Sequence, residues 1–556
     1  MKKEIWIEAK RKTFFLSLIG NTICLIAFLL VMRPVFATND DVTIEEMVSG
    51  ACGMQDAHII YQNYLLGKLY VFLYSLTKNI PWYGLIQYVF LLIAFSTIVY
   101  VLWERFPKTL RITLTALVLC FFGYECYIDM QYTKTAGVLT VAGILLIFHE
   151  CTKAYASKKL LVLGIALSCV GSMYRFEQFI ACIALMSGLG VYQLWKNWKE
   201  DGLKKIWKPV LWVGITLTVS FVLKGFDTYI YESDPQWKQY TEYNELRTQL
   251  LDYDFPEYKD YEKEYTELGI TEDAYDLWRH WNFDDPDLFN IETMKKLVSL
   301  TSAKVLNKEL IENFFDKFPK RYFQTPVFYC VLLVFILWIL EKKNSMEKNV
   351  TFFYEIFLFM GLYFYLYWQG RYDKNHVDVS LWLAVILVLI WTMDGTRQWF
   401  TKQTGVVLCA AVLVFSQYQW YDNWRTNAEQ EGIDARSILE DLKDDQEHLY
   451  ITKSKTLDYA DGYGPLDIMP EGISSNFTFF GGWETDTALW KEKLARYDVV
   501  NPYKDSINNE KVRLIDDDID VTMNYIHTYY DANAKAVKLH TYKGYPVYKI
   551  VSEDEG

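Results

Sequence analysis

The sequence predicts a polytopic α-helical membrane protein, with about eleven transmembrane helices, an outer helical insertion and a small C-terminal α/β domain outside the membrane. Three observations support this fold class. Hydrophobic residues make up 52% of the 556 residues while charged residues still reach 22%, as expected when apolar spans alternate with water-exposed segments. The apolar residues gather in separate runs, and the loops between those runs alternate in charge.

The apolar runs give the expected spans. A helix needs roughly 20 apolar residues to cross a bilayer, and some of these runs are shorter, so their boundaries are soft. The expected spans are 13–36, 82–103, 110–124, 135–149, 159–173, 177–195, 208–225, 324–341, 351–368, 377–394 and 405–420.

Every second loop is basic, which orients the chain. Lys and Arg gather before residue 13 and again in the loops that follow the second, fourth, sixth, eighth and tenth spans. Cytoplasmic loops carry such an excess, so the N-terminus is expected inside the plasma (cytoplasmic) membrane. The alternate segments then lie outside, including the short loops near residues 130, 175 and 371.

The chain divides into four parts on this topology. Residues 1–225 form the first part of the membrane domain, with an outer loop at 37–80, and residues 321–420 form the second part. Between them, 226–320 is an extracytoplasmic helical insertion, where "YTEYNELRTQLLDY" has helical spacing. Residues 421–556 form a C-terminal α/β domain: "HLYITK" and "YPVYKIV" alternate like strands, and "ALWKEKLARY" and "DVTMNYIHTYY" are typical of helices.

Charge and cysteine content exclude some functions. The net charge of −13 argues against nucleic acid as a partner, because a phosphate backbone requires a basic surface. The nine cysteines form no CxxC pair and fall mostly within apolar runs, which argues against a zinc site or a disulfide framework.

Two adjacent aspartates, Asp40 and Asp41, follow directly on the first span. One interpretation is helix capping, because a carboxylate at the start of a helix is stabilised by the helix dipole. The other is general-base catalysis, in which a partly desolvated Asp takes the proton from an attacking sugar hydroxyl. The residues alone leave both interpretations open.

Three cations lie at the outer ends of other spans, where the positive-inside rule does not expect them. They are Lys134 in "YTKTAG", Arg175 in "MYRFEQF" and Arg371 in "WQGRYDKNH". Each could reach the lipid headgroups or pair with a nearby carboxylate. Each could also bind a phosphate, for which Arg supplies two parallel donors and Lys a point charge. Their presence on the same face as the aspartate pair favours phosphate binding.

In this layout the chain resembles the GT-C superfamily of membrane glycosyltransferases. The resemblance is carried by "NDD" at 39–41 after the first span and by "DAHIIYQNYLLGKLYVFLY" at 56–74 as helices on the membrane surface. Weaker support comes from "MQYTKTAG" at 130–137, "YRFEQF" at 174–179 and "WQGRYDKN" at 368–375. The order of spans and loops resembles the superfamily over the whole membrane part, whereas the motifs match only in these short stretches.

The resemblance implies an inverting glycosyltransferase that moves a sugar from a polyprenyl-phosphate carrier to an envelope polysaccharide or lipid acceptor. Asp41 or Asp40 would be the catalytic base, with Asp41 preferred because Asp40 lies nearer the membrane end. The substrate-binding residues would be Lys134, Arg175, Arg371 and His58. The implied cofactor is the lipid-linked sugar itself. Some branches of the superfamily bind a divalent metal through an acidic pair. Adjacent aspartates point in opposite directions on most backbones, so a metal is not favoured here.

Two other classes of function compete with this one. A non-catalytic polytopic scaffold or receptor could use its acidic outer domains to bind a partner, although it would not need outer cations beside an aspartate pair. A lipid-linked glycan transporter or polymerase should carry charges near the middle of its spans. The charges of this chain gather at the span ends instead.

Overall fold

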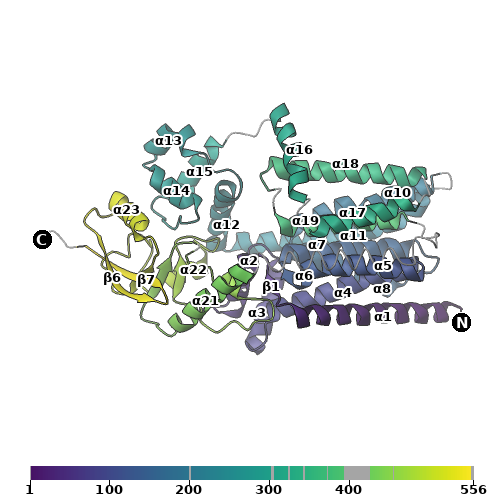
Figure 1. The fold of residues 1–556 in the computed structure, drawn as a ribbon, viewed down its shortest axis with the longest axis horizontal. Coiled ribbons are helices and arrows are strands. Elements are labelled where there is room, and N and C mark those ends of the chain that lie inside the picture. Colours follow the sequence, from purple (N-terminus) through teal and green to yellow (C-terminus); the bar gives the residue numbers. More distant parts are fainter. Residues whose placement is uncertain are drawn as a thin grey trace.

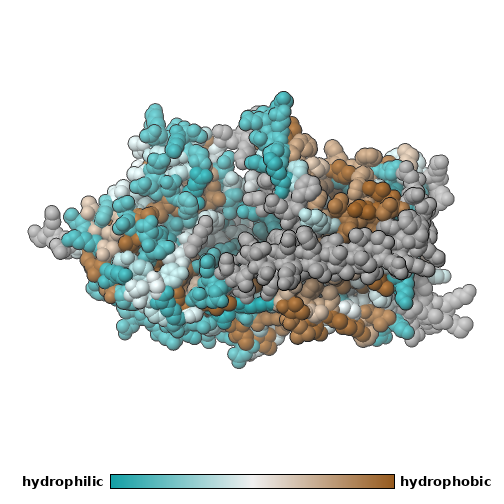
Figure 2. Space-filling view, viewed as in Figure 1, coloured by the Kyte–Doolittle hydropathy of each residue, from teal (hydrophilic) through white to brown (hydrophobic). Residues whose placement is uncertain are grey.

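The structure is a computed structural model that describes residues 2–198, 202–301, 306–322, 326–341, 345–371, 374–393, 426–454 and 456–552. A bundle of long helices runs along the molecule, with the N-terminus at one end and two hydrophilic regions at the other (Figure 1). We call the latter the domain end of the bundle. Apolar side chains cover much of the bundle surface, whereas hydrophilic side chains dominate the domain end (Figure 2).

Ten of the eleven expected spans coincide with helices, and the remaining one, 405–420, lies outside the described residues. Within the described residues, seven helical segments are long and apolar enough to cross a membrane, and shorter apolar helices accompany them. The helices that coincide with the expected spans, long and short together, are α1 (Lys2–Val31), α4 (Trp82–Arg105), α5 (Lys108–Leu117) with its continuation to Tyr127, α7 (Tyr132–Cys151), α8 (Lys158–Tyr174), α9 (Phe176–Met186), α10 (Gly188–Lys196), α11 (Gly202–Ser233), α17 (Pro326–Leu340), α18 (Met346–Trp368) and α19 (Asn375–Trp391).

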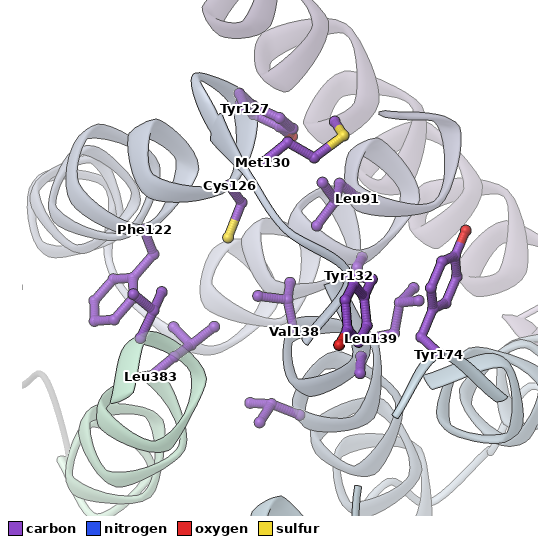
Figure 3. Close-up of a cluster of buried hydrophobic side chains, with 14 of the residues drawn as sticks. Leu91, Phe122, Cys126, Tyr127, Met130, Tyr132, Val138, Leu139, Tyr174 and Leu383 are labelled. Carbon is purple, nitrogen blue, oxygen red and sulfur yellow. The ribbon is translucent and has the colours of Figure 1, made fainter. Parts of the chain in front are cut away.

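Helix α7 lies at the centre of the bundle and packs against α4, α8, α9 and α19. Figure 3 shows Val138 and Leu139 of α7 among side chains from α4, α8 and α19. The contact with α8 is close because a Cβ at Gly143 would lie only 2.3 Å from the carbonyl oxygen of Gly164. Small residues allow membrane helices to approach in this way.

The helical insertion expected from the sequence is present at the domain end. It contains α12 (Pro235–Arg247), the π-helical turn Thr248–Tyr253, α13 (Glu262–Glu267), α14 (Glu272–Arg279) and α15 (Ile291–Leu300), and α16 (Lys308–Tyr322) leads back to the bundle. Helix α12 begins with Asp234, whose carboxylate accepts from the backbone N–H of Gln236 and of Trp237. This is a typical N-cap, with Pro235 in the first turn.

The C-terminal region is a mixed α/β structure, as expected. Its five-stranded sheet has the order β4-β3-β5-β7-β6, in which β3 is parallel to both of its neighbours and β7 is antiparallel to β5 and β6. The elements are α21 (Thr426–Leu442), β3 (Leu449–Thr452), β4 (Phe477–Phe479), α22 (Ala488–Ala495), β5 (Val512–Ile515), α23 (Ile519–Tyr529), β6 (Lys535–Tyr542) and β7 (Tyr545–Val551). The two strands and two helices expected from the sequence are β3, β7, α22 and α23.

A short strand pairing positions the acidic pair. Strand β1 (Val35–Phe36) leaves α1 and pairs in parallel with β2 (Asp129–Met130), which directly precedes α7. Helix α2 (Asn39–Ser49) follows and stops at Gly50, which adopts the left-handed conformation, with φ of 81°. The first turn of α2 is therefore held against the first turn of α7, and α3 (Tyr64–Leu76) follows α2 along the chain.

Candidate functional site

A cavity of about 670 Å³ lies at the domain end, where several bundle helices begin or end. Its walls come from the start of α2, the start of α7, the junction of α8 and α9, the π-helical turn after α12, the end of α18, the start of α19 and the loops before and after β4. Segments far apart in the chain thus meet in one place. The cavity joins the helical bundle to both hydrophilic regions.

The two aspartates face different surroundings. Asp40 lines the cavity, and its Oδ2 lies 3.5 Å from the hydroxyl of Tyr132. Asp41 is fully buried behind it and does not line the cavity; its Oδ1 accepts from the hydroxyl of Tyr83 at 2.8 Å and from the backbone N–H of Tyr132 at 3.3 Å. Both belong to the first turn of α2, where the helix dipole favours carboxylates.

Burial alters the acidity of both carboxyl groups. It raises the pKa of Asp41 from 3.8 to about 8, and hydrogen bonds from Tyr83 and Gln87 partly oppose this shift. Burial also raises the pKa of Asp40 above its ordinary value, with the positive charge of Arg175 acting in the opposite direction. Asp40 therefore combines access to the cavity with the increased basicity that suits a general base.

Arg175 and Arg371 both line this cavity. Arg175 lies between α8 and α9, with its Nε 3.0 Å from a carboxylate oxygen of Glu177 and its guanidinium 5.3 Å from the ring centre of Tyr61. Arg371 lies 3.6 Å from the carboxylate of Asp252, and its guanidinium is 4.9 Å from the ring centre of Tyr253. Three of the residues that the sequence singled out, Asp40, Arg175 and Arg371, are thus brought together.

Further residues that the sequence did not single out belong to this site. Lys374 and His376 line the cavity beside Arg371. Arg247 is fully buried nearby, 3.7 Å from the same Asp252 carboxylate, and its positive charge acts on Asp40. Lys374 falls within the stretch 368–375 that pointed to this region, but in the sequence Arg247 is one charge among many on a polar helix.

The cavity lining changes in character from the bundle to the domains. Between α9, α18 and α19 it is apolar, with Ala181, Leu362, Leu366 and Leu381. The segment before α3, the helical insertion and the C-terminal region add aromatic and acidic side chains. These are Tyr61, Tyr253, Trp281, Trp483, Asp458 and Glu484. The cavity lining therefore combines apolar, cationic, acidic and aromatic side chains.

Lys134 lies outside this cavity. Its ammonium group is fully buried and contacts the carboxylates of Asp129 at 2.6 Å and of Glu125 at 3.0 Å, as well as the main-chain carbonyls of both residues. An ammonium group has only three hydrogens to donate, so these four oxygens occupy it. The phosphate-binding role expected for Lys134 is therefore replaced by an internal ion pair that holds the loop before α7.

His58 is also absent from the cavity lining. Its ring stacks on Trp237 with centroids 4.4 Å apart, and its Nδ1 lies 2.6 Å from a carboxylate oxygen of Asp56. The ring of Tyr231 packs edge-on against it. These contacts join the segment before α3 to α11 and α12, so the structure places His58 in a packing role in place of the expected substrate contact.

No metal site accompanies the acidic pair in the described part of the chain, where no group of three or more His, Cys, Asp and Glu side chains is arranged to hold a metal ion. As expected for adjacent helical residues, the two aspartates point toward different partners.

Comparison with known proteins gave one similar structure. No family model and no curated protein matches the sequence. The crystal structure of ArnT from Cupriavidus metallidurans bound to undecaprenyl phosphate is similar over 98% of this chain and 97% of that chain, with 11% sequence identity and a TM-score of 0.41.

Proposed function

We propose that this protein is a membrane glycosyltransferase that takes a sugar from a polyprenyl-phosphate carrier, with Asp40 as general base. The observation that carries the proposal is the meeting of Asp40, Arg175 and Arg371 in one cavity at the ends of the membrane helices. The acceptor is proposed to be an envelope polysaccharide or a lipid, on the outer face of the plasma membrane.

The cavity matches the three chemical parts of such a carrier. Apolar side chains between α9, α18 and α19 suit the polyprenyl chain, which remains at bilayer depth. Arg175 and Arg371 lie at the ends of the helices, at the depth where a phosphate group stays hydrated. Beyond them the aromatic faces of Tyr61 and Trp483 suit a sugar ring.

Charge favours the phosphate as the leaving group. Asp252 lies between Arg247 and Arg371, at 3.7 and 3.6 Å, which are the outer limits of an ion pair. Arg371 lines the cavity and can turn toward a phosphate and donate two parallel hydrogen bonds to it. Arg247 is held by hydrogen bonds to Asn244 and Thr248 and adds positive charge nearby.

The reaction is a single displacement. Asp40 takes the proton of an acceptor hydroxyl as the hydroxyl oxygen forms a bond with the anomeric carbon. The bond between that carbon and the phosphate oxygen breaks, and its electron pair remains on the phosphate, where the guanidinium groups stabilise the negative charge. Attack opposite to the leaving phosphate inverts the anomeric configuration. Asp41 takes no part in proton transfer and supports the first turn of α2 from behind.

The test follows a radiolabelled polyprenyl-phosphate sugar in membranes that contain the wild-type protein or Asp40→Asn. Asn preserves the shape of Asp but cannot accept the proton at neutral pH. Transfer should fall by about 100-fold or more, the usual contribution of a general base. Retention of the lipid-linked sugar on the purified variant should not change.

Two outcomes separate the base from a structural role. Asp40→Glu keeps a carboxylate and should recover part of the transfer that Asp40→Asn loses. If Asp40→Asn transfers sugar at the wild-type rate, Asp40 is a helix-capping residue and the proposed mechanism fails. A variant that loses both transfer and folded protein would be uninformative by itself, so thermal unfolding of each variant is measured alongside.

A further inference from the structure

A second cavity, of about 320 Å³, lies between the helical insertion and the C-terminal region. We call it the distal cavity. Its lining comes from α12, the loop 284–292 and the segment 485–490. Residues next to these in the chain, Trp281 and 481–484, line the first cavity. The two cavities are therefore lined by successive residues of the same two chain segments.

Asp284 is an unusual member of the distal cavity. Its side chain is only 1% exposed, and neither carboxylate oxygen has a hydrogen-bond partner among the described residues. Its neighbour Asp285 differs, because that carboxylate accepts hydrogen bonds from Tyr525, Tyr530 and Asn501. A buried carboxyl group without hydrogen-bond partners destabilises a fold. Retention of such a group beside a cavity indicates a ligand that supplies hydrogen bonds.

Other unpartnered polar atoms accompany Asp284. Within the described residues the Oδ2 of Asp486 and the indole N–H of Trp490 are buried and form no hydrogen bond. Both residues line the distal cavity. The first atom needs a donor and the second needs an acceptor. The aromatic side chains of Tyr243, Phe289 and Trp490 contribute flat apolar surface to the same lining.

These features define the chemistry of the ligand. The described lining contains four carboxyl groups and no Lys, Arg or His, and the cation nearest to Asp486, Lys491, is paired with its Oδ1, so the lining offers an anionic ligand no free positive charge. A metal ion would satisfy carboxylates but not the indole N–H, and no group of three suitable ligands occurs among the described residues. Hydroxyl groups both donate and accept, and a sugar ring presents several of them beside an apolar face.

We propose that the distal cavity binds one sugar unit of a saccharide that carries no acidic group. The hydroxyls of that unit donate to Asp284 and Asp486 and accept from Trp490, and the ring packs on the aromatic side chains. Burial raises the pKa of Asp284 well above its usual range, so its protonated carboxyl group can also donate to a hydroxyl oxygen. Because Trp483 of the first cavity lies two residues before Thr485 of the distal cavity, a bound chain could extend toward it. That role rests on the proposed transferase function, whereas binding itself does not.

The test measures saccharide binding to the full-length protein in nanodiscs, which avoids detergents with sugar headgroups. The probes are maltotriose, a glucosamine trimer and a galacturonic acid trimer, each followed by saturation-transfer NMR without any lipid-linked sugar. The neutral or the amino trimer should bind and the acidic trimer should not. Trp490→Phe and Asp284→Leu should each weaken binding at least tenfold, because each removes hydrogen-bonding atoms and leaves an apolar side chain in their place.

Controls separate this site from the transfer site. Arg371→Ala should lose transfer and still bind the trimer, so failure of the transferase proposal would leave this result unaffected. Binding of none of the three trimers would overturn the inference, as would unchanged binding by Trp490→Phe. Thermal stabilisation of the wild type by calcium chloride but not by the trimers would identify a cation site instead. If Asp284→Leu does not fold, Trp490→Phe decides.

Discussion

Asp41 should hold a proton in the folded protein at neutral pH, and Asp41→Asn tests this. Its carboxyl group is fully buried at the start of α2, and burial raises its pKa to about 8. In the unfolded chain the same group titrates near 3.8. The substitution removes the titrating group while keeping a carbonyl oxygen that can accept from the Tyr83 hydroxyl, as Oδ1 does now.

The sign and size of the effect follow from these two values. Between about pH 4 and pH 8 the folded state binds one proton more than the unfolded state at this position, so stability falls as the pH rises. The slope is about 1.4 kcal/mol per pH unit. Asn does not titrate, so the free energy of unfolding of the variant does not fall with pH through this position. From pH 5 to pH 7 the free energy of unfolding of the variant should therefore gain about 3 kcal/mol relative to the wild type.

Thermal unfolding, followed by tryptophan fluorescence at pH 5, 6, 7 and 8, measures this difference. Burial also raises the pKa values of the neighbouring Glu45 and Glu46, to about 8 and about 7, so the wild-type curve contains their contributions as well. The difference between wild type and variant isolates Asp41. Asp273→Asn, an exposed position in the first turn of α14, is the control and should give a curve parallel to that of the wild type. Parallel curves for Asp41→Asn as well would show that Asp41 is ionised and refute the reasoning.

Three other predictions concern the cations and the topology. Arg371→Lys should reduce sugar transfer, and Arg371→Ala should reduce it further, both at normal protein abundance. The control variant Arg279→Lys changes an exposed side chain of the insertion and should transfer sugar at the wild-type rate. Equal loss of protein abundance in both Arg371 variants would indicate a structural ion pair. Lys134→Ala should remove the buried ammonium group that pairs with Glu125 and Asp129 and destabilise the protein by about 3–5 kcal/mol, measured as loss of folded protein by size-exclusion chromatography. Normal yield would argue against the buried ion pair. In intact cells a membrane-impermeant thiol reagent should label Asp260→Cys but not Lys158→Cys, and the reverse labelling would invert the topology.

The span pattern was predictable because it depends on local properties. A run of about 20 apolar residues is a requirement of the bilayer, whatever the neighbouring helices are. The period of "YPVYKIV" likewise predicts a strand, and that segment is β7. The nearness of Asp40 to the end of the first span was also visible in the sequence.

The tertiary structure decided which of these residues share a site. The sequence favoured Asp41 over Asp40 as the base. The rotation of α2 about its axis depends on the pairing of β1 with β2 and on the hydrogen bond from Tyr83 to Asp41. These contacts place Asp40, and not Asp41, toward the cavity.

The sequence itself determined the membrane spans, their alternating loops and the acidic pair after the first span, because hydrophobic length and charge act locally along the chain. Only the tertiary structure decided that Lys134 forms a buried ion pair with Glu125 and Asp129. It also decided that Arg247 and Arg371 both lie beside Asp252, and that Asp284 and Asp486 line one cavity. Apart from the local pairings of Lys134 and of Arg247 with Asp252, these contacts join residues more than a hundred positions apart, and they form only when the helices and domains pack together.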